Sequence, residues 1–208
     1  MHVISGRFKG APLASPNANT RPTTDRTKEA IFSRLDAWDV IADARVLDLY
    51  AGTGALGIEA LSRGARELVC VESDGRTATL IAKTLTTLKH GRAWAAAPGI
   101  AARVIRAKAE RYAAAGSGPF DLILIDPPYA LSTDDCDRLL ADLASSGTAA
   151  DDALIVLERS VRSEEPSAPA GWMIGERRDY GETAVYYIER DAGSDSDRDG
   201  ERDGELGE

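Results

Sequence analysis

The chain has 208 residues, of which 43% are hydrophobic and 28% are charged, a composition typical of one globular domain and not of a disordered or fibrous protein. Its apolar runs are far shorter than the ~20 residues of a membrane-spanning helix, and its start, MHVISGRFKG, has no apolar signal segment. The two cysteines, Cys70 and Cys136, have no metal-ligand spacing and make no disulfide framework. We therefore expect a cytoplasmic protein with no membrane span and no metal site.

The formal net charge of −9 is unevenly distributed along the chain. Residues 1–34 carry six Lys or Arg and two acidic residues, whereas residues 189–208 carry nine acidic residues and three Arg. This asymmetry indicates a basic amino-terminal face. The stretch from Gly193 has Leu206 as its only large apolar residue, so we expect it to be disordered. The predicted organisation is an arm at residues 1–20, a domain at residues 21–190 and a disordered acidic tail at residues 191–208.

The first predicted elements are an arm and a helix. Short apolar stretches interrupted by glycine predict a small β-hairpin or arm between Val3 and Pro16. The Thr-Thr-Asp at residues 23–25 provides good N-cap types, so a helix is expected to begin there, with Ile31, Phe32 and Leu35 on its inner face. Three charged side chains are expected on its outer face: Arg26, Lys28 and Glu29.

From residue 45 onward, predicted strands and helices alternate, which is typical of a mostly parallel sheet with helices on both faces. Five strands are expected at Arg45–Tyr50, Glu67–Glu72, Arg103–Ala107, Phe120–Ile125 and Ala153–Glu158. Helices are expected at Ala55–Arg63, Gly75–Lys89, a short stretch through Tyr112, and Thr133–Ala144, and a loop at Gly91–Gly99. Two further strands, Trp172–Asp179 and Thr183–Glu189, have no helix between them and predict a closing antiparallel β-hairpin.

A glycine-rich motif, Gly52-Thr53-Gly54-Ala55-Leu56-Gly57, lies between the first of these strands and its helix. Glu72 ends the next strand, 20 positions after Gly52. Glycines allow the backbone to approach a ligand closely, and an acid at the second strand can accept hydrogen bonds from ribose hydroxyls. By these marks alone, the motif suits a dinucleotide or another nucleoside cofactor.

Asp48, near the end of the first strand, distinguishes between these cofactors. A carboxylate at this place would repel the pyrophosphate of NAD, whereas S-adenosylmethionine brings an ammonium and a sulfonium group. Asp48 therefore favours S-adenosylmethionine, although the carboxylate could instead serve only the backbone amides of the turn. An NAD-dependent oxidoreductase is further disfavoured by the absence of a hydride-site His or Tyr-Lys pair.

The sequence Asp126-Pro127-Pro128-Tyr129 follows the apolar strand Phe120–Ile125. In an open α/β sheet, ligands bind at the carboxyl ends of the strands where the strand order reverses. If the first and fourth strands are neighbours there, the Asp126 carboxylate and a carbonyl near Pro127 can accept both N–H bonds of an exocyclic base amine. Tyr129 then offers a flat face on which an extruded base can stack. The motif predicts direct methyl transfer to an amino nitrogen.

These motifs resemble the class I S-adenosylmethionine-dependent methyltransferases, which have a Rossmann-like fold. Within that class, RPTTDRTKEAIFSRL (residues 21–35) and the opening ISGRFKG are similar to the bacterial 16S ribosomal RNA guanine-N2 methyltransferases of the RsmD family, over roughly residues 2–190. The resemblance implies methylation of N2 of one guanine, guanine 966, in 16S ribosomal RNA or a small-subunit ribosomal particle, by a monomer.

The resemblance also implies roles for residues at matching positions. Cofactor contacts are expected from Asp48, Tyr50, Ala51, Gly52, Thr53, Gly54, Glu72, Ser73, Ala109, Glu110 and Asp126. Catalytic roles are expected for Asp126, Pro127 and Tyr129. Substrate contacts are expected from Arg7, Lys9, Arg21, Thr23, Thr24, Arg26, Pro128 and Tyr129. Ala109 and Glu110 depart from the clean Asp of the family pattern, and Glu110 is equally well explained as a surface acid of a helix.

Two other functions use the same residues. A DNA adenine-N6 methyltransferase shares the Asp-Pro-Pro-Tyr chemistry, but the ordered chain leaves little room for a sequence-reading domain. A non-catalytic RNA-binding protein of ribosome assembly could retain the fold, and would then not depend on Asp126.

Overall fold

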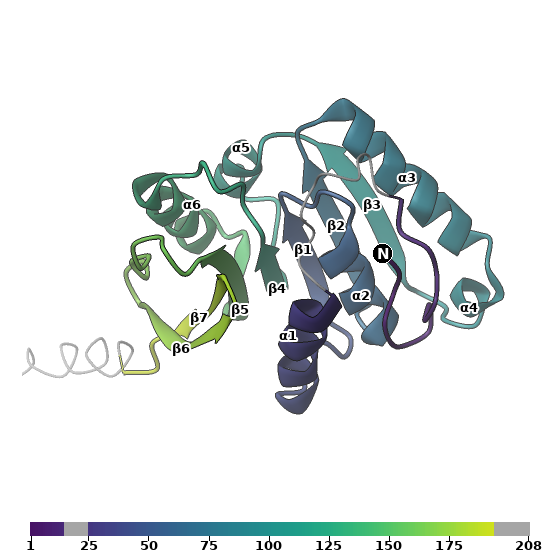
Figure 1. The fold of residues 1–208 in the computed structure, drawn as a ribbon, viewed down its shortest axis with the longest axis horizontal. Coiled ribbons are helices and arrows are strands. Elements are labelled where there is room, and N and C mark those ends of the chain that lie inside the picture. Colours follow the sequence, from purple (N-terminus) through teal and green to yellow (C-terminus); the bar gives the residue numbers. More distant parts are fainter. Residues whose placement is uncertain (15–24, 194–208) are drawn as a thin grey trace, which may run out of the picture.

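Seven strands form one sheet in the computed structural model, which describes residues 1–14 and 25–193. The strands are β1 (Arg45–Leu49), β2 (Glu67–Glu72), β3 (Ala101–Arg106), β4 (Phe120–Ile125), β5 (Ala149–Ser160), β6 (Trp172–Tyr180) and β7 (Thr183–Arg190). The helices are α1 (Asp25–Ala37), α2 (Ala55–Arg63), α3 (Gly75–Lys89), α4 (Arg92–Ala95), α5 (Ala109–Ala114) and α6 (Thr133–Ser145). Figure 1 shows the sheet between its helices.

The strand order is β3-β2-β1-β4-β5-β7-β6. The first five strands in this order, β3, β2, β1, β4 and β5, pair in parallel, whereas β7 is antiparallel to both β5 and β6. The chain order reverses between β1 and β4, which is where ligands bind in sheets of this kind. The predicted α/β fold, with a mostly parallel seven-stranded sheet and a closing antiparallel hairpin, is confirmed.

Apolar side chains on the two faces of the sheet pack into two separate clusters. Along β1, Val46 faces the cluster that contains residues of α1, α2 and α3, and Leu47 faces the cluster that contains residues of α5 and α6. This alternation follows from the two-residue period of a strand. It buries the central strands β1, β2 and β4 on both faces, as their continuous apolar runs predict.

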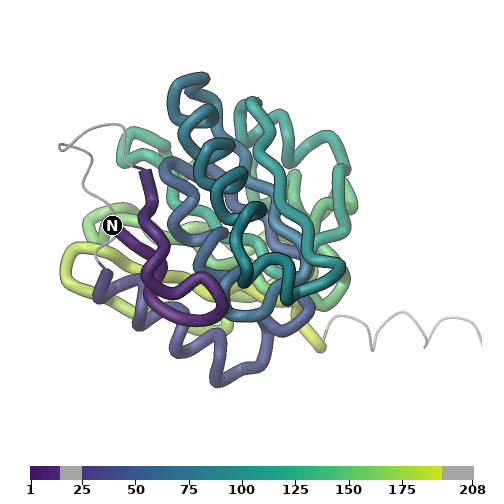
Figure 2. The backbone as a smooth tube through the Cα atoms, turned by 90° about the vertical axis from the view of Figure 1, so that its right-hand side faces the viewer, coloured from purple at the N-terminus to yellow at the C-terminus, as the bar shows by residue number. Residues whose placement is uncertain are grey.

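The amino-terminal segment was expected to be a small β-hairpin or arm, and the structure shows an arm. It is a looped segment with one isolated antiparallel bridge, between His2 and Pro12, and it lies beside α2 and α3 (Figure 2). Some of its backbone amides bond within the arm and others bond to α2: Ile4 and Ser5 donate to the carboxylate of Glu59 at 2.8 and 2.9 Å. Because these two amides bond to α2, they are not available to extend a ladder within the arm.

The expectation that Lys28 lies on the outer face of α1 is wrong, since its side chain is 1% exposed. Lys28 occupies the first position of the i, i+3, i+4, i+7 stripe that includes Ile31, Phe32 and Leu35, and this stripe faces the core. Its charge is paired with Glu59 of α2.

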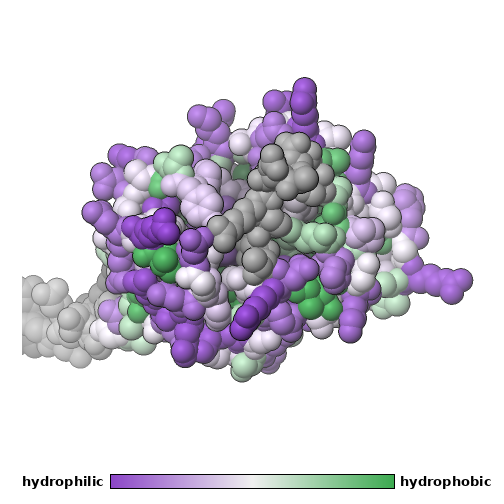
Figure 3. Space-filling view, in the orientation of Figure 1, coloured by the Kyte–Doolittle hydropathy of each residue, from purple (hydrophilic) through white to green (hydrophobic). Residues whose placement is uncertain are grey.

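Other differences are local. The loop expected at residues 91–99 contains the short helix α4, β3 begins two residues earlier than expected, and β5 begins at Ala149. Residues 15–24, including the expected start of the first helix, lie outside the described residues, as do residues 194–208 of the predicted tail. Among the described helices, none is long and apolar enough to cross a membrane. The face shown in Figure 3 is mostly hydrophilic, with apolar side chains in small patches.

Candidate functional site

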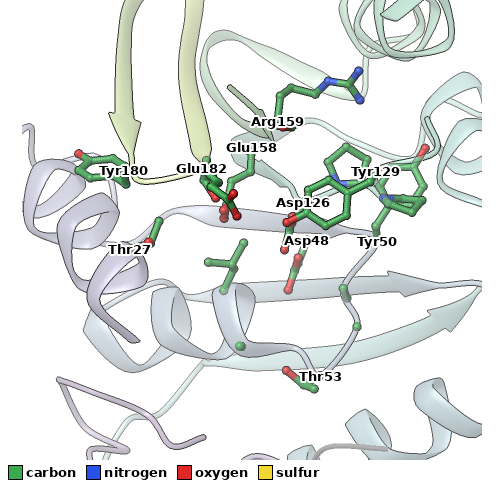
Figure 4. Close-up of a pocket in the computed structure, with 18 of the residues that line it drawn as sticks. Thr27, Asp48, Tyr50, Thr53, Asp126, Tyr129, Glu158, Arg159, Tyr180 and Glu182 are labelled. Carbon is green, nitrogen blue, oxygen red and sulfur yellow. The ribbon is translucent and has the colours of Figure 1, made fainter. Parts of the chain in front are cut away.

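A cleft of about 1010 Å³ opens at the carboxyl ends of the parallel strands, next to the reversal of strand order. Its wall includes the glycine turn after β1, the tip of β2, and the Asp-Pro-Pro-Tyr segment after β4. Helix α1, the end of β5 and the turn between β6 and β7 complete it. Figure 4 shows these parts around one hollow, with Thr27 of α1 and Tyr180 of the β6–β7 turn on the same side.

The glycine turn after β1 adopts a backbone that favours glycine at two of its positions. Gly52 and Gly54 have φ angles of +55° and +73°, and Tyr50 has +56°. A Cβ atom on Gly54 would lie 3.1 Å from the side chain of Ile58. Because the turn is this tight, helix α2 begins directly beneath the cleft, and residues 50–53, 55 and 56 line it, whereas Gly54, a predicted cofactor contact, does not.

Asp48 is almost fully buried in the floor of the cleft, at 1% exposure, and its Oδ2 accepts a hydrogen bond of 2.9 Å from the amide of Gly57. The carboxylate therefore bonds to the first turns of helix α2 and not to an amide of the glycine turn. A Cβ atom on Gly57 would lie 2.8 Å from that same oxygen, so glycine is required for this approach. Burial, with smaller contributions from the nearby charges of Asp126 and Glu72, raises the pKa of Asp48 to about 8. A cation bound beside Asp48 would reverse this effect.

Glu72, at the tip of β2, links the two neighbouring loops. Its Oε2 accepts from the amide of Gly52 at 2.9 Å, and its Oε1 accepts from the amide of Asp74 at 2.8 Å. Asp74 in turn caps α3 by accepting from the amide of Thr77. The hydrogen bonds that the Asp74 carboxylate accepts from Thr77 lower the pKa of Asp74. Glu72 and the adjacent Ser73 both line the cleft.

The structure places Asp126 directly beside the glycine turn. Strands β1 and β4 are neighbours, and their last register pair joins Leu49 to Ile125, the residue before Asp126. Asp126 is exposed, and the side chain of Tyr129 is 73% exposed. In Figure 4 the ring of Tyr129 lies next to Asp126, with Asp48 below it. The hypothesis that Asp126–Tyr129 belong to the site required the first and fourth strands to be neighbours, and the structure meets this requirement.

Tyr50 connects the cleft to α5. Its hydroxyl donates a 2.7 Å hydrogen bond to Oε1 of Glu110, and burial together with this bond raises the pKa of Tyr50. Ala109 is buried, and neither it nor Glu110 lines the cleft, although both were predicted cofactor contacts. Glu110 instead positions Tyr50, which does line it.

The predicted substrate residues separate into three groups. Arg26 lines the cleft, as do Pro128 and Tyr129. Arg7 and Lys9 line a different, shallower groove of about 350 Å³ between the arm and the α3–α4 corner. Three predicted residues lie outside the described part of the chain: Arg21, Thr23 and Thr24.

Sequence reasoning missed several other residues that line the cleft. They are Met1, Thr27, Ala30, Thr77, Glu158, Arg159, Ser160, Ser163 and residues 179–183. Glu158 could have been found, because an acid directly follows the apolar run of β5, as Asp126 follows that of β4. The β6–β7 turn could not, because its position depends on the antiparallel pairing of β7 with β5.

The residues of the cleft fit S-adenosylmethionine. The volume is at the upper end of that of small-molecule sites, and two carboxylates, those of Asp48 and Glu72, lie beside a glycine turn. These acids suit an ammonium, a sulfonium and ribose hydroxyls, and oppose a pyrophosphate. Among the described residues, no group of three or more His, Cys, Asp or Glu side chains is arranged to hold a metal ion.

Comparison with known proteins agrees with this arrangement. The family model described as conserved hypothetical protein 95 matches residues 1–189. The ribosomal RNA small subunit methyltransferase D of Escherichia coli K12 is 35% identical over 200 residues, covering 96% of this chain and 94% of the relative. The solved structure of the Escherichia coli protein yhhF, also 35% identical, covers 92% of this chain and 98% of its own, with a TM-score of 0.77. A magnesium protoporphyrin IX methyltransferase from Synechocystis with bound SAM shares the fold at 16% identity and a TM-score of 0.60, covering 80% of this chain and 79% of its own.

Proposed function

Because this chain belongs to the family described as conserved hypothetical protein 95, the RsmD family that its motifs resemble, we propose that it methylates small-subunit ribosomal RNA with S-adenosylmethionine as the methyl donor. The methylated atom is the exocyclic N2 of one guanine, guanine 966 by the family resemblance. The protein acts as a monomer in the cytoplasm. One observation carries the proposal: the pairing of β1 with β4 brings the glycine turn and Asp126–Tyr129 into one cleft.

The cofactor side of the cleft comprises the glycine turn, Asp48 and Glu72. S-adenosylmethionine supplies a methyl group on a positively charged sulfur, and this sulfur becomes a neutral thioether when the C–S bond breaks. Asp48 and Glu72 provide the negative charge and the acceptors that favour such a cation over a dinucleotide.

Asp126 compensates for the poor nucleophilicity of the acceptor, the amino group of guanine. The amino group of guanine is planar and a poor nucleophile, because its lone pair is delocalised into the ring. The Asp126 carboxylate accepts one N–H bond and the backbone carbonyl of Pro127 accepts the other, which orients the nitrogen lone pair toward the methyl carbon. Positive charge develops on N2 as the N–C bond forms, and the nearby carboxylate stabilises it. The proton of N2 then passes to Asp126, which is exposed and returns it to solvent.

Tyr129 provides the surface for the base. A guanine must leave its stack to reach the cleft, and an aromatic ring can replace part of the lost stacking. The side chain of Tyr129 is 73% exposed next to Asp126, which makes its ring available for this purpose.

The experiment incubates the protein with radiolabelled S-adenosylmethionine and, in parallel, small-subunit particles, free small-subunit RNA and duplex DNA. Mass spectrometry of the digested nucleosides identifies the product, and mapping of the RNA locates it. We expect N2-methylguanosine at a single position in RNA. Label in DNA alone would indicate an adenine-N6 enzyme, and RNA binding without any label would indicate a non-catalytic assembly protein. Either outcome overturns the proposal.

A further inference from the structure

Glu158 directly follows the apolar run of β5, at the same level of the sheet at which Asp126 follows the neighbouring strand β4. The last register pair of these parallel strands joins Ile125 to Leu157, so Asp126 and Glu158 are the next residues along the two strands. Side chains alternate between faces along a strand, and the residues two positions before each acid belong to the same core cluster. Both acids line the cleft, and Figure 4 shows both carboxyl groups directed into the same hollow.

The surroundings distinguish Glu158 from the other acid nearby. Glu158 is 4% exposed, whereas the side chain of Glu182, on the β6–β7 turn, is 54% exposed and lies 3.5 Å from Arg162. Arg159 belongs to the opposite face of the strand and donates to the carbonyl of Leu131 at 3.0 Å, and Figure 4 shows its guanidinium pointing away from Glu158. A hydrogen bond to a buried carboxylate is stronger than one to an exposed carboxylate, because little water competes for it.

The edge of guanine matches this pair of acids. On that edge the N2 amino group lies directly beside N1–H, and both are donors. If N2 is held at Asp126, its neighbour N1–H faces either β1 or β5. The β1 side is occupied by the glycine turn and Asp48, which belong to the cofactor half of the cleft. N1–H therefore faces β5.

We propose that Glu158 is the specificity-determining residue of the acceptor site, and that its carboxylate accepts the N1–H of the target guanine. This inference rests on the proposed function. Adenine presents an unprotonated N1 at the same position, and two acceptors facing each other there would repel. Glu158 thus selects guanine by what it accepts, while Asp126 acts on the amine that is methylated.

The test compares guanine with 2-aminopurine at the target position of small-subunit RNA. 2-Aminopurine keeps the 2-amino group but has an unprotonated N1, so it differs in the contact assigned to Glu158. Methyl transfer to each base is measured as kcat/KM for the wild type, Glu158→Gln, Glu182→Gln and, as a control that does not line the cleft, the exposed Glu164→Gln. Calorimetric titration with S-adenosylmethionine verifies that each variant is folded and binds the cofactor.

The wild type should prefer guanine. Glu158→Gln can donate its amide N–H to the bare N1, so we expect it to reduce the guanine preference by about 10- to 100-fold, the range that one good base contact supports. Glu182→Gln and Glu164→Gln should leave the preference unchanged. If Glu158→Gln slows both bases equally, or if Glu182→Gln alone changes the preference, Glu158 does not read N1–H, and the proposed function stands. If the wild type transfers no methyl group to guanine RNA, the proposed function itself fails.

Discussion

The Nζ atom of Lys28 lies 3.3 Å from Oε2 of Glu59, and both side chains are buried, at 1% and 0% exposure. The same carboxylate accepts the amides of Ile4 and Ser5 in the arm and Nε of Arg63 in α2. Glu59 therefore joins α1, α2 and the arm. Because Thr27, adjacent to Lys28, lines the cleft, this buried network holds one wall of the site in place.

Replacing Glu59 by Gln should strongly destabilise the protein. The substitution leaves the buried ammonium of Lys28 without its counter-charge, which costs roughly 3–5 kcal/mol of the free energy of unfolding. Urea unfolding measures this cost. The double variant Lys28→Met, Glu59→Gln should recover part of it, because both buried charges are then removed. Asp151→Asn, which breaks an exposed ion pair with Arg190, should cost less than about 1 kcal/mol. If Glu59→Gln costs no more than Asp151→Asn, the buried pair contributes no more to stability than an exposed ion pair does.

Replacing Asp48 by Asn should stabilise the ligand-free protein and weaken cofactor binding. The pKa of Asp48 is raised from 3.8 to about 8 in the folded state, mainly by burial, so the unfolded chain releases this proton more easily. The wild type therefore loses stability relative to Asp48→Asn as the pH rises from about 4 to about 8, and the difference is constant above that range. Thermal unfolding of both proteins at pH 4, 6 and 9 measures it.

A rise in pH should have the opposite effect on cofactor binding at Asp48, favouring it instead of opposing it. The ionised form of Asp48 is the one that attracts a cation, so the affinity of the wild type for S-adenosylmethionine should rise with pH toward about 8. Asp48→Asn should bind more weakly and lose that pH dependence in calorimetric titrations. Equal affinities at pH 6 and pH 9 in the wild type would contradict a role for this charge.

Replacing Asp126 by Asn should slow catalysis strongly without weakening cofactor binding. The neutral amide cannot stabilise positive charge on the amino nitrogen, and the loss of one such electrostatic contact typically lowers kcat by roughly 100- to 1,000-fold. The dissociation constant for S-adenosylmethionine should change little. Asp134→Asn, an exposed acid in the first turn of α6, is the matched control and should retain full activity.

Replacing Tyr129 by Ala should affect the RNA substrate. Loss of one stacked base contact is worth ~1–3 kcal/mol, so kcat/KM for RNA should fall by about 5- to 150-fold. Tyr129→Phe keeps the ring and should remain close to the wild type. The melting temperature should be unaffected in both, because the side chain is largely exposed. If Tyr129→Phe is as slow as Tyr129→Ala, the hydroxyl and not the ring face is the important group.

Local patterns predicted most of the fold. Apolar runs placed β1, β2 and β4 to within one residue, and the period of the helices placed α2 and α3 at their observed bounds. These elements are predictable because strand and helix periods are properties of neighbouring residues. The arm was predicted, but its docking was not, because two of its amides bond to Glu59, more than 50 positions away.

The same contrast holds at the site. The sequence alone determined the glycine turn, the two strand-end acids Asp48 and Glu72, and the segment Asp126–Tyr129, since each follows a recognisable strand. Only the tertiary structure decided that Lys28 is buried, that Glu110 supports Tyr50 and that Glu158 stands beside Asp126. The physical reason is that a residue at a strand end acquires its neighbours through the order in which strands pair, and that order depends on how the whole chain packs its helices over both faces of the sheet.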